Sequence, residues 1–176
     1  MNGVFFLKYL ERHWEMMFEV LNGIVIVLYS KSNFIIYPPK ITSILKQRTM
    51  KNQALATVQE MFSAFGTGDL ERFKKTVSED TVWTYHGTHR IPKAIFHGRE
   101  AAARFINNIL TTTQIIKFEP QQFVTEGNTV VVIGEEHQKI KRTGEELKQR
   151  WVQVYTVEDN VITRMEEFAV TEEVGK

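Results

Sequence analysis

Apolar positions between residues 52 and 65 recur at intervals of three and four, which predicts an amphipathic helix with one buried stripe. Residues 66–69 contain two glycines and end that helix, and Asp69 is suited to cap a second, short helix. The second helix is expected to contain Leu70, Phe73 and Val77. Helical spacing returns over residues 99–110, so the pattern predicts three helices.

Strand composition first occurs at residues 81–85, and we expect a loop over residues 86–98 before the third helix. Alternating segments joined by short turns then predict a meander of four strands, at residues 113–125, 129–141, 146–157 and 161–171. Helices followed by antiparallel strands indicate an α+β domain, in which the helices cover one face of a curved sheet.

The first 49 residues differ in pattern from the rest of the chain. They show no sustained helical or strand periodicity, and the apolar run 18–29 is shorter than the roughly 18 to 20 apolar residues of a membrane-spanning helix. No export signal is recognisable, so we expect a cytoplasmic protein. We predict that residues 50–176 form the domain. Residues 1–49 are predicted to be a poorly ordered extension from a misassigned start or, alternatively, a regulatory or interaction segment.

Composition excludes several function classes. Lys and Arg number 22 against 21 Asp and Glu, and this net charge of +1 gives no basis for nucleic-acid binding. The absence of cysteine excludes disulfides, thiolate metal sites and cysteine nucleophiles. No glycine-rich phosphate loop, nucleophile elbow or metal-ligand motif is present, so we expect no cofactor and no covalent catalysis.

Several short motifs follow one another in a distinctive order. They are Val58-Gln59-Glu60-Met61-Phe62, Gly68-Asp69-Leu70, Glu79-Asp80 with Val82-Trp83, His97-Gly98-Arg99-Glu100, Trp151-Val152, and Val161-Ile162-Thr163-Arg164. In this order and spacing, residues 52–172 resemble the SnoaL-like, ketosteroid-isomerase-related family of the nuclear-transport-factor-2-like superfamily. The resemblance implies a cone-shaped fold with one apolar cavity between helices and sheet, and a homodimer formed through the outer sheet face.

The best-known catalytic positions of that family are not matched. The resemblance places Met61 where the steroid isomerases have an oxyanion-donating tyrosine, and Tyr85 where they have a basic aspartate. It places Gln153 near their protonated aspartate, and Val170 where cyclase-like relatives have an aspartate. A neutral tyrosine is a poor base at pH 7. Steroid isomerase and standard polyketide cyclase chemistry are therefore disfavoured, and the family alone does not decide the function.

Side-chain alternation along the last strands suggests other catalytic candidates. If residues 143–144 and 159–160 are two-residue turns, Gln153 pairs with Glu166 and both share a face with Glu136. This face is the one where the resemblance places the cavity. A desolvated carboxyl has a raised pKa, so Glu136 or Glu166 is predicted to act as general base or acid, with Gln153 beside them.

Aromatic and neighbouring side chains are the candidates for ligand binding. They are Trp83, Tyr85, His97, Trp151, Tyr155, Phe168, Met61, Phe62 and Phe105. His97 precedes Gly98 at the expected mouth of the cavity. The histidines at 86, 89 and 97 are separated by three and eight residues, which fits no metal-ligand motif, so we expect no metal site.

Structural alternatives remain open for the acidic candidates. Arg164 or Arg104 could neutralise Glu166, and Glu136 could lie solvated at an open rim. A one-residue bulge would reverse the alternation and separate the three side chains.

The sequence thus predicts a small-molecule pocket protein that catalyses cofactor-independent acid–base chemistry of isomerase, cyclase or hydrolase type on a small apolar or aromatic ligand. The alternative is a non-catalytic ligand-binding protein or a dimeric interaction module. In the latter, an outer sheet face with Val131, Val152 and Val154 would bind the partner. We expect neither nucleic acid nor membrane as a partner.

Overall fold

The computed structural model describes residues 5–6, 17–21, 24–28, 34–37 and 39–172. The chain divides into two compact units, Met1–Thr49 and Met50–Lys176. The first unit contains an antiparallel sheet in the order β1-β2-β3-β4, with strands Phe5–Phe6, Met17–Leu21, Ile24–Leu28 and Phe34–Tyr37.

Residues 1–49 thus contain four short strands, although their sequence shows no sustained strand periodicity. Strands β3 and β4 are continuous apolar runs rich in β-branched residues, and such runs show no alternation for a periodicity test to find. The expectation that residues 1–49 are poorly ordered falls in part on residues outside those described, and it stays a prediction. The origin of residues 1–49 stays a prediction.

The three predicted helices are confirmed as α1 (Pro39–Thr67), α2 (Leu70–Lys75) and α3 (Arg99–Thr112). Asp69 caps α2, because its Oδ1 accepts a hydrogen bond of 2.9 Å from the backbone N–H of Arg72. Helix α1 begins well before residue 52, and Val77 belongs to the next strand instead of α2.

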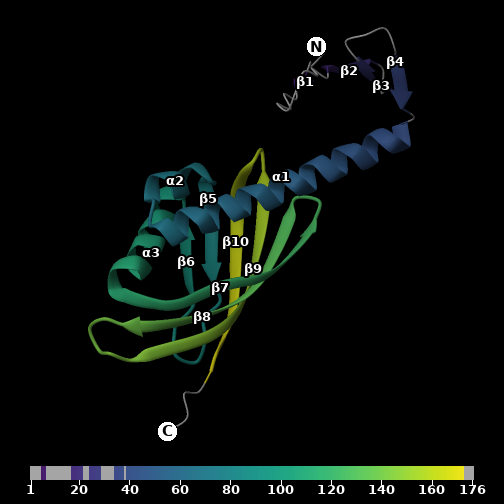
Figure 1. Ribbon diagram of the computed structural model, residues 1–176. Coiled ribbons are helices and arrows are strands. Elements are labelled where there is room, and N and C mark those ends of the chain that lie inside the picture. Colours follow the sequence, from purple (N-terminus) through teal and green to yellow (C-terminus); the bar gives the residue numbers. More distant parts are fainter. Residues whose placement is uncertain (1–4, 7–16, 22–23, 29–33, 38, 173–176) are drawn as a thin grey trace. The chain divides into compact units, whose positions relative to one another are not determined.

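Six strands form one curved, unclosed sheet in the order β6-β5-β10-β9-β8-β7 (Figure 1). Their bounds are β5 Val77–Tyr85, β6 Ala94–His97, β7 Thr113–Glu126, β8 Thr129–Ile140, β9 Glu146–Glu158 and β10 Val161–Thr171. The meander β7 to β10 is confirmed, and all its pairings are antiparallel. Strand β10 also pairs in parallel with β5, which joins the first strand to the meander.

Strand β6 corrects the prediction that residues 86–98 are all loop. It is a short edge strand of four residues that pairs only with β5, from Val82 with His97 to Tyr85 with Ala94. Nearby Gly87 and Pro92 masked this signal, because both residues are typical of loops.

One of the two predicted two-residue turns is present. Between β9 and β10, Glu158 pairs with Val161, and Asp159 and Asn160 both have positive φ (49° and 64°), as a tight hairpin turn requires. Between β8 and β9, Lys139 pairs with Glu146, so that connection is longer than two residues and the prediction was wrong there. The longer loop shifts the register by an even number, which leaves the side-chain alternation of β9 relative to β8 unchanged.

The core lies between the helices and the inner face of the sheet. The buried stripe of α1 includes Ala54, Val58, Met61 and Ala64, and it belongs to one cluster with inward side chains of β8, β9 and β10. No helix of residues 39–172 is long and apolar enough to span a membrane.

Candidate active site

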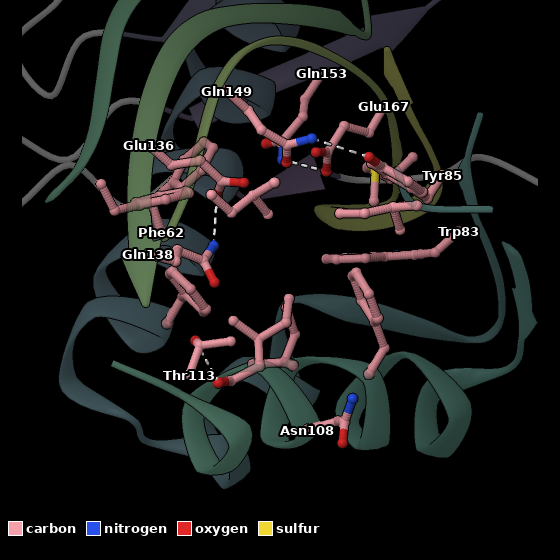
Figure 2. A pocket seen from close by; sticks show the side chains of 18 of the residues that line it. Phe62, Trp83, Tyr85, Asn108, Thr113, Glu136, Gln138, Gln149, Gln153 and Glu167 are labelled. Carbon is pink, nitrogen blue, oxygen red and sulfur yellow. Dashed lines mark hydrogen bonds between the residues drawn. The ribbon is translucent and has the colours of Figure 1, made fainter. Parts of the chain in front are cut away.

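A cavity of about 310 Å³ opens between α1, α3 and the inner face of the sheet. At about 30 Å³ for a water-sized group, it has room for on the order of ten non-hydrogen atoms. Most of its wall is apolar, and a few polar side chains converge on it, as is typical of small-molecule sites. Figure 2 shows Glu136, Gln149, Gln153 and Glu167 gathered on one side of this space and Asn108 of α3 across from them.

Six of the nine predicted ligand-binding residues line this cavity: Met61, Phe62, Trp83, Tyr85, Phe105 and Tyr155. Their rings brace one another. The Phe62 and Tyr155 ring centres are 6.0 Å apart in an edge-to-face arrangement, and those of Trp83 and Tyr155 are 6.5 Å apart. Their contact with a ligand stays a prediction.

Trp151 lies in the core behind the cavity wall. Its ring stacks on Phe118 at 5.3 Å and on Phe62 at 6.2 Å, and both of these rings line the cavity. It fits because its cross-strand partner is Gly134: a Cβ added there would lie 2.4 Å from the indole ring. Trp151 therefore supports the aromatic wall from behind.

His97 and Phe168 lie away from the cavity lining. His97 is exposed on the edge strand β6. Phe168 is 48% exposed, and its ring stacks on His86 at a centre distance of 4.2 Å.

A bulge in β10 explains why the alternation prediction failed for Glu166. Ile162 pairs with Val157 but Arg164 pairs with Thr156, so Thr163 is an extra residue on β10. From that point every side chain is moved to the other face, and Gln153 pairs with Glu167 instead of Glu166. The predicted pairing of Gln153 with Glu166 was therefore wrong.

Glu166 lies on the outer face with two basic partners. Its Oε1 is 3.1 Å from His86 Nε2 and 3.2 Å from Arg164 Nη2. Hydrogen bonds from His86 and then Arg164 lower the pKa of the Glu166 carboxyl. This geometry matches the alternative in which Arg164 neutralises Glu166, and it removes the argument for Glu166 as a base in the cavity.

Glu167 is the acidic residue of β10 that lines the cavity, and the sequence prediction missed it. Glu167 is only 8% exposed. The Gln153 Nε2 donates to Glu167 Oε2 at 2.9 Å, and the Tyr155 hydroxyl donates to Gln153 Oε1 at 2.5 Å. Tyr155 thus orients the amide of Gln153, and the amide orients the carboxyl. Within residues 39–172 no basic side chain pairs with Glu167.

Burial raises the pKa of Glu167 to about 7, with a further increase from the charge of Glu136 that the Gln153 hydrogen bond opposes. Glu136 also lines the cavity, and burial raises its pKa against the effect of a hydrogen bond from Gln138 Nε2 at 2.7 Å. The predicted placement of Glu136 and Gln153 on the cavity face therefore holds, with Glu136 partly exposed and Gln153 buried.

Two further polar groups complete this wall. Gln149 Nε2 is 3.3 Å from the Tyr85 hydroxyl and 3.1 Å from Thr171 Oγ1. Burial raises the pKa of both Tyr85 and Tyr155, so these phenols are neutral hydrogen-bonding groups at pH 7. The arrangement can hold a ligand and exchange one proton with it near neutral pH through Glu167.

One signal in the sequence could have revealed Glu167. The apolar residues Ile162 and Met165 are both fully buried yet three positions apart, and such a spacing within a strand requires a bulge. Among residues 39–172 no group of three or more acidic or histidine side chains is arranged to hold a metal ion.

Comparison with known proteins agrees with this architecture. A family model described as a SnoaL-like domain matches residues 58–165, which is more than half of the chain. The chain belongs to the SnoaL-like family. The match runs from Val58 in the C-terminal part of α1 to Met165 in β10, so α2, α3 and most of the six-stranded sheet fall within this SnoaL-like domain. No curated protein matches the chain.

Solved structures share the fold of this SnoaL-like domain. An NTF2-like protein from Burkholderia xenovorans is 25% identical with a TM-score of 0.61, covering 68% of this chain and 91% of that one. Bal32a, from a soil-derived mobile gene cassette, is 20% identical with the same TM-score and coverages. An LEH-like epoxide hydrolase from Mycobacterium tuberculosis is 13% identical with a TM-score of 0.56, covering 68% and 84%.

Proposed function

We propose that this SnoaL-like protein catalyses cofactor-independent proton transfer on a small, largely apolar ligand bound in the cavity, with Glu167 as the general base or acid. The observation that carries the proposal is the Glu167 carboxyl, which lines the cavity without a basic partner and has a pKa of about 7. A general base works best when its pKa lies near the working pH.

Gln153 and Glu136, both predicted from the sequence as catalytic candidates, are given supporting roles in this proposal. Gln153 is a positioning residue, because its amide fixes the orientation of the Glu167 carboxyl. Glu136 is a second acidic group of the same wall, and its negative charge raises the proton affinity of Glu167. Tyr85 is placed to hydrogen-bond a ligand oxygen, and the aromatic rings hold the apolar body.

The reaction belongs to the isomerase, cyclase or hydrolase type, since each needs one proton moved to or from carbon or water. A proton leaves the ligand, or a water molecule attacking it, for the Glu167 carboxylate, and returns from the carboxylic acid to the product. An epoxide hydrolase among the structures of the same fold supports including hydrolysis of apolar epoxides.

The test uses a panel of cyclic ketones and apolar epoxides of about ten non-hydrogen atoms, a size set by the cavity. NMR in D₂O follows deuterium uptake next to the carbonyl and opening of the epoxide. We expect at least one compound to react faster than in buffer, and E167Q to lower that rate by about 10²-fold or more. E166Q is the matched control, because it changes the adjacent carboxyl on the outer face and should keep the rate.

Full activity of E167Q would refute Glu167 as the base. A panel without turnover, combined with a ligand that binds in the cavity, would favour the alternative of a non-catalytic binding protein.

We also propose that the protein forms a homodimer through the outer sheet face. Apolar side chains from three adjacent strands meet on this face: Val131, Ile133, Val152, Val154 and Phe168 pair across β8, β9 and β10. Phe168 is 48% and Val170 is 71% exposed in the single chain, and exposed apolar groups of this kind favour association.

A further inference from the structure

The polar wall of the cavity carries negative charge without a positive group. Glu136 and Glu167 both line the cavity, while none of its lining residues is Lys, Arg or His. The hydrogen-bond donors to these two carboxyls are the neutral amides of Gln138 and Gln153. Figure 2 shows both carboxyls on the same side of the cavity, with the amides between and beside them.

The basic side chains nearest in sequence are used elsewhere. His137, next to Glu136, pairs with Glu146, and Arg164, three residues before Glu167, pairs with Glu166 on the outer face of the sheet, so neither compensates the acidic groups inside. A buried carboxyl is ordinarily paired with a cation, because an isolated charge is expensive to remove from water. The two cavity carboxyls instead repel each other, and any ligand that enters must share the space with them.

This charge pattern should favour some classes of ligand over others. An anionic ligand would add a third negative group to a desolvated space, and a neutral ligand would leave the repulsion unchanged. A cationic ligand would offset both carboxyls at once.

Aromatic side chains from the helices and from the sheet suit the body of such a cation. Rings of Phe62, Trp83, Phe105 and Tyr155 line the cavity, and the faces of aromatic rings attract organic cations. Helices α1 and α3 contribute no charged residue to the lining, so the apolar body and the charged head of a ligand meet different walls.

We propose that the cavity selects an organic cation: a protonated or quaternary amine with an apolar or aromatic body of about ten non-hydrogen atoms. Glu136 and Glu167 supply its counter-charge, and the aromatic rings enclose the rest. The inference rests on the proposed function only in taking the same cavity as the ligand site, and it names the class of ligand.

Binding of such a cation is linked to pH through the groups that face Glu167. These are Glu136 on β8, Tyr155 on β9 and Tyr85 on β5. Burial raises the pKa of all three groups, so the two phenols stay neutral at pH 8. With a pKa of about 7, Glu167 is about one tenth ionised at pH 6 and about nine tenths ionised at pH 8. A permanent cation should therefore bind about tenfold more tightly at pH 8 than at pH 6.

The test compares probes of the same shape and different charge by isothermal titration calorimetry on the full chain. Phenyltrimethylammonium is the cation, tert-butylbenzene is its neutral counterpart, and benzoate is an anion of similar size. We expect the affinity for the cation to rise about tenfold from pH 6 to pH 8, with no rise for the hydrocarbon and no measurable binding of benzoate.

Two variants and a control assign the effect to the cavity. E136Q and E167Q should each weaken cation binding at pH 8 by about tenfold or more while leaving hydrocarbon binding unreduced, and E166Q should leave both unchanged. Retained hydrocarbon binding also shows that each variant is folded. The proposal is overturned if the cation fails to bind at millimolar concentration, if benzoate binds as tightly, or if neither cavity variant weakens cation binding.

This measurement is separate from turnover. Cation binding that depends on the cavity carboxyls, without turnover of any panel compound, would support the inference and remove the catalytic proposal. Turnover of neutral compounds that depends on Glu167, with no cation binding, would support the catalytic proposal and remove the inference of a cationic ligand.

Discussion

Replacing Glu167 by glutamine should change how the stability of the protein depends on pH. The folded state binds the Glu167 proton more tightly than the unfolded state, because the pKa rises from 4.5 to about 7 on folding. The stabilising contribution of that proton is fully present below pH 4.5 and is lost as the pH rises through 7. At pH 8 the native protein therefore carries the full cost of a buried carboxylate.

The size of this cost follows from the same values. Each unit of pH between the two pKa values is worth about 1.4 kcal/mol, so ionisation removes about 3 kcal/mol of stability between pH 4.5 and pH 8. Glutamine at position 167 cannot ionise, so E167Q lacks this loss. Any fixed cost of the new amide, such as an unpaired N–H, is the same at every pH and does not affect the slope.

Urea-induced unfolding of both proteins at pH 5, 6, 7 and 8 would measure the effect. We expect the stability of E167Q relative to the native protein to increase from pH 5 to pH 8, by nearly the full cost of about 3 kcal/mol. E166Q is again the matched control, and it should change the pH dependence of stability in the opposite direction. The lowered pKa of Glu166 stabilises the fold above its ordinary pKa, so E166Q should lose less than about 1 kcal/mol at pH 7. A difference between E167Q and the native protein that stays constant from pH 5 to pH 8 would refute the argument.

Two further predictions concern packing and assembly. Gly134→Ala should destabilise the fold by about 1 to 3 kcal/mol, because the added Cβ would lie 2.4 Å from the Trp151 ring and 2.6 Å from the Glu119 backbone oxygen. Thermal and urea unfolding would measure the loss of stability, and an unchanged unfolding midpoint would contradict this packing. Val152→Asp should convert the proposed dimer into a monomer, because it puts a charge opposite Phe168 in the apolar outer face. Light scattering after size exclusion would measure the molar mass, and Asp159→Asn, an exposed change at the β9–β10 turn, should leave the dimer intact. A dimer that persists in Val152→Asp would place the interface elsewhere.

Most of the fold could be predicted because its signals are local. The helices and the four-strand meander follow from apolar spacing and from glycine, asparagine and aspartate at the turns, and these act over a few residues. Strand β6 was missed because it is short and its partner β5 is reached only across the loop between them.

The candidate site was only partly predictable because it depends on register. Glu136 and Gln153 were placed on the correct face, since the wrong loop length after β8 preserved alternation. Glu166 was placed on the wrong face, since one inserted residue in β10 reversed it. The pKa of Glu167 was beyond the sequence altogether, because it depends on which groups lie around the carboxyl in space.

The bulge at Thr163 has a consequence for how this protein can diverge. Because it sets Glu166 against His86 outside and Glu167 against Gln153 inside, two adjacent codons control unrelated surfaces. A substitution at position 166 alters the charge of the outer sheet face, and one at position 167 alters the charge of the cavity wall. Selection can therefore adjust the proposed dimer interface and the proposed ligand site separately, through neighbouring residues of a single strand.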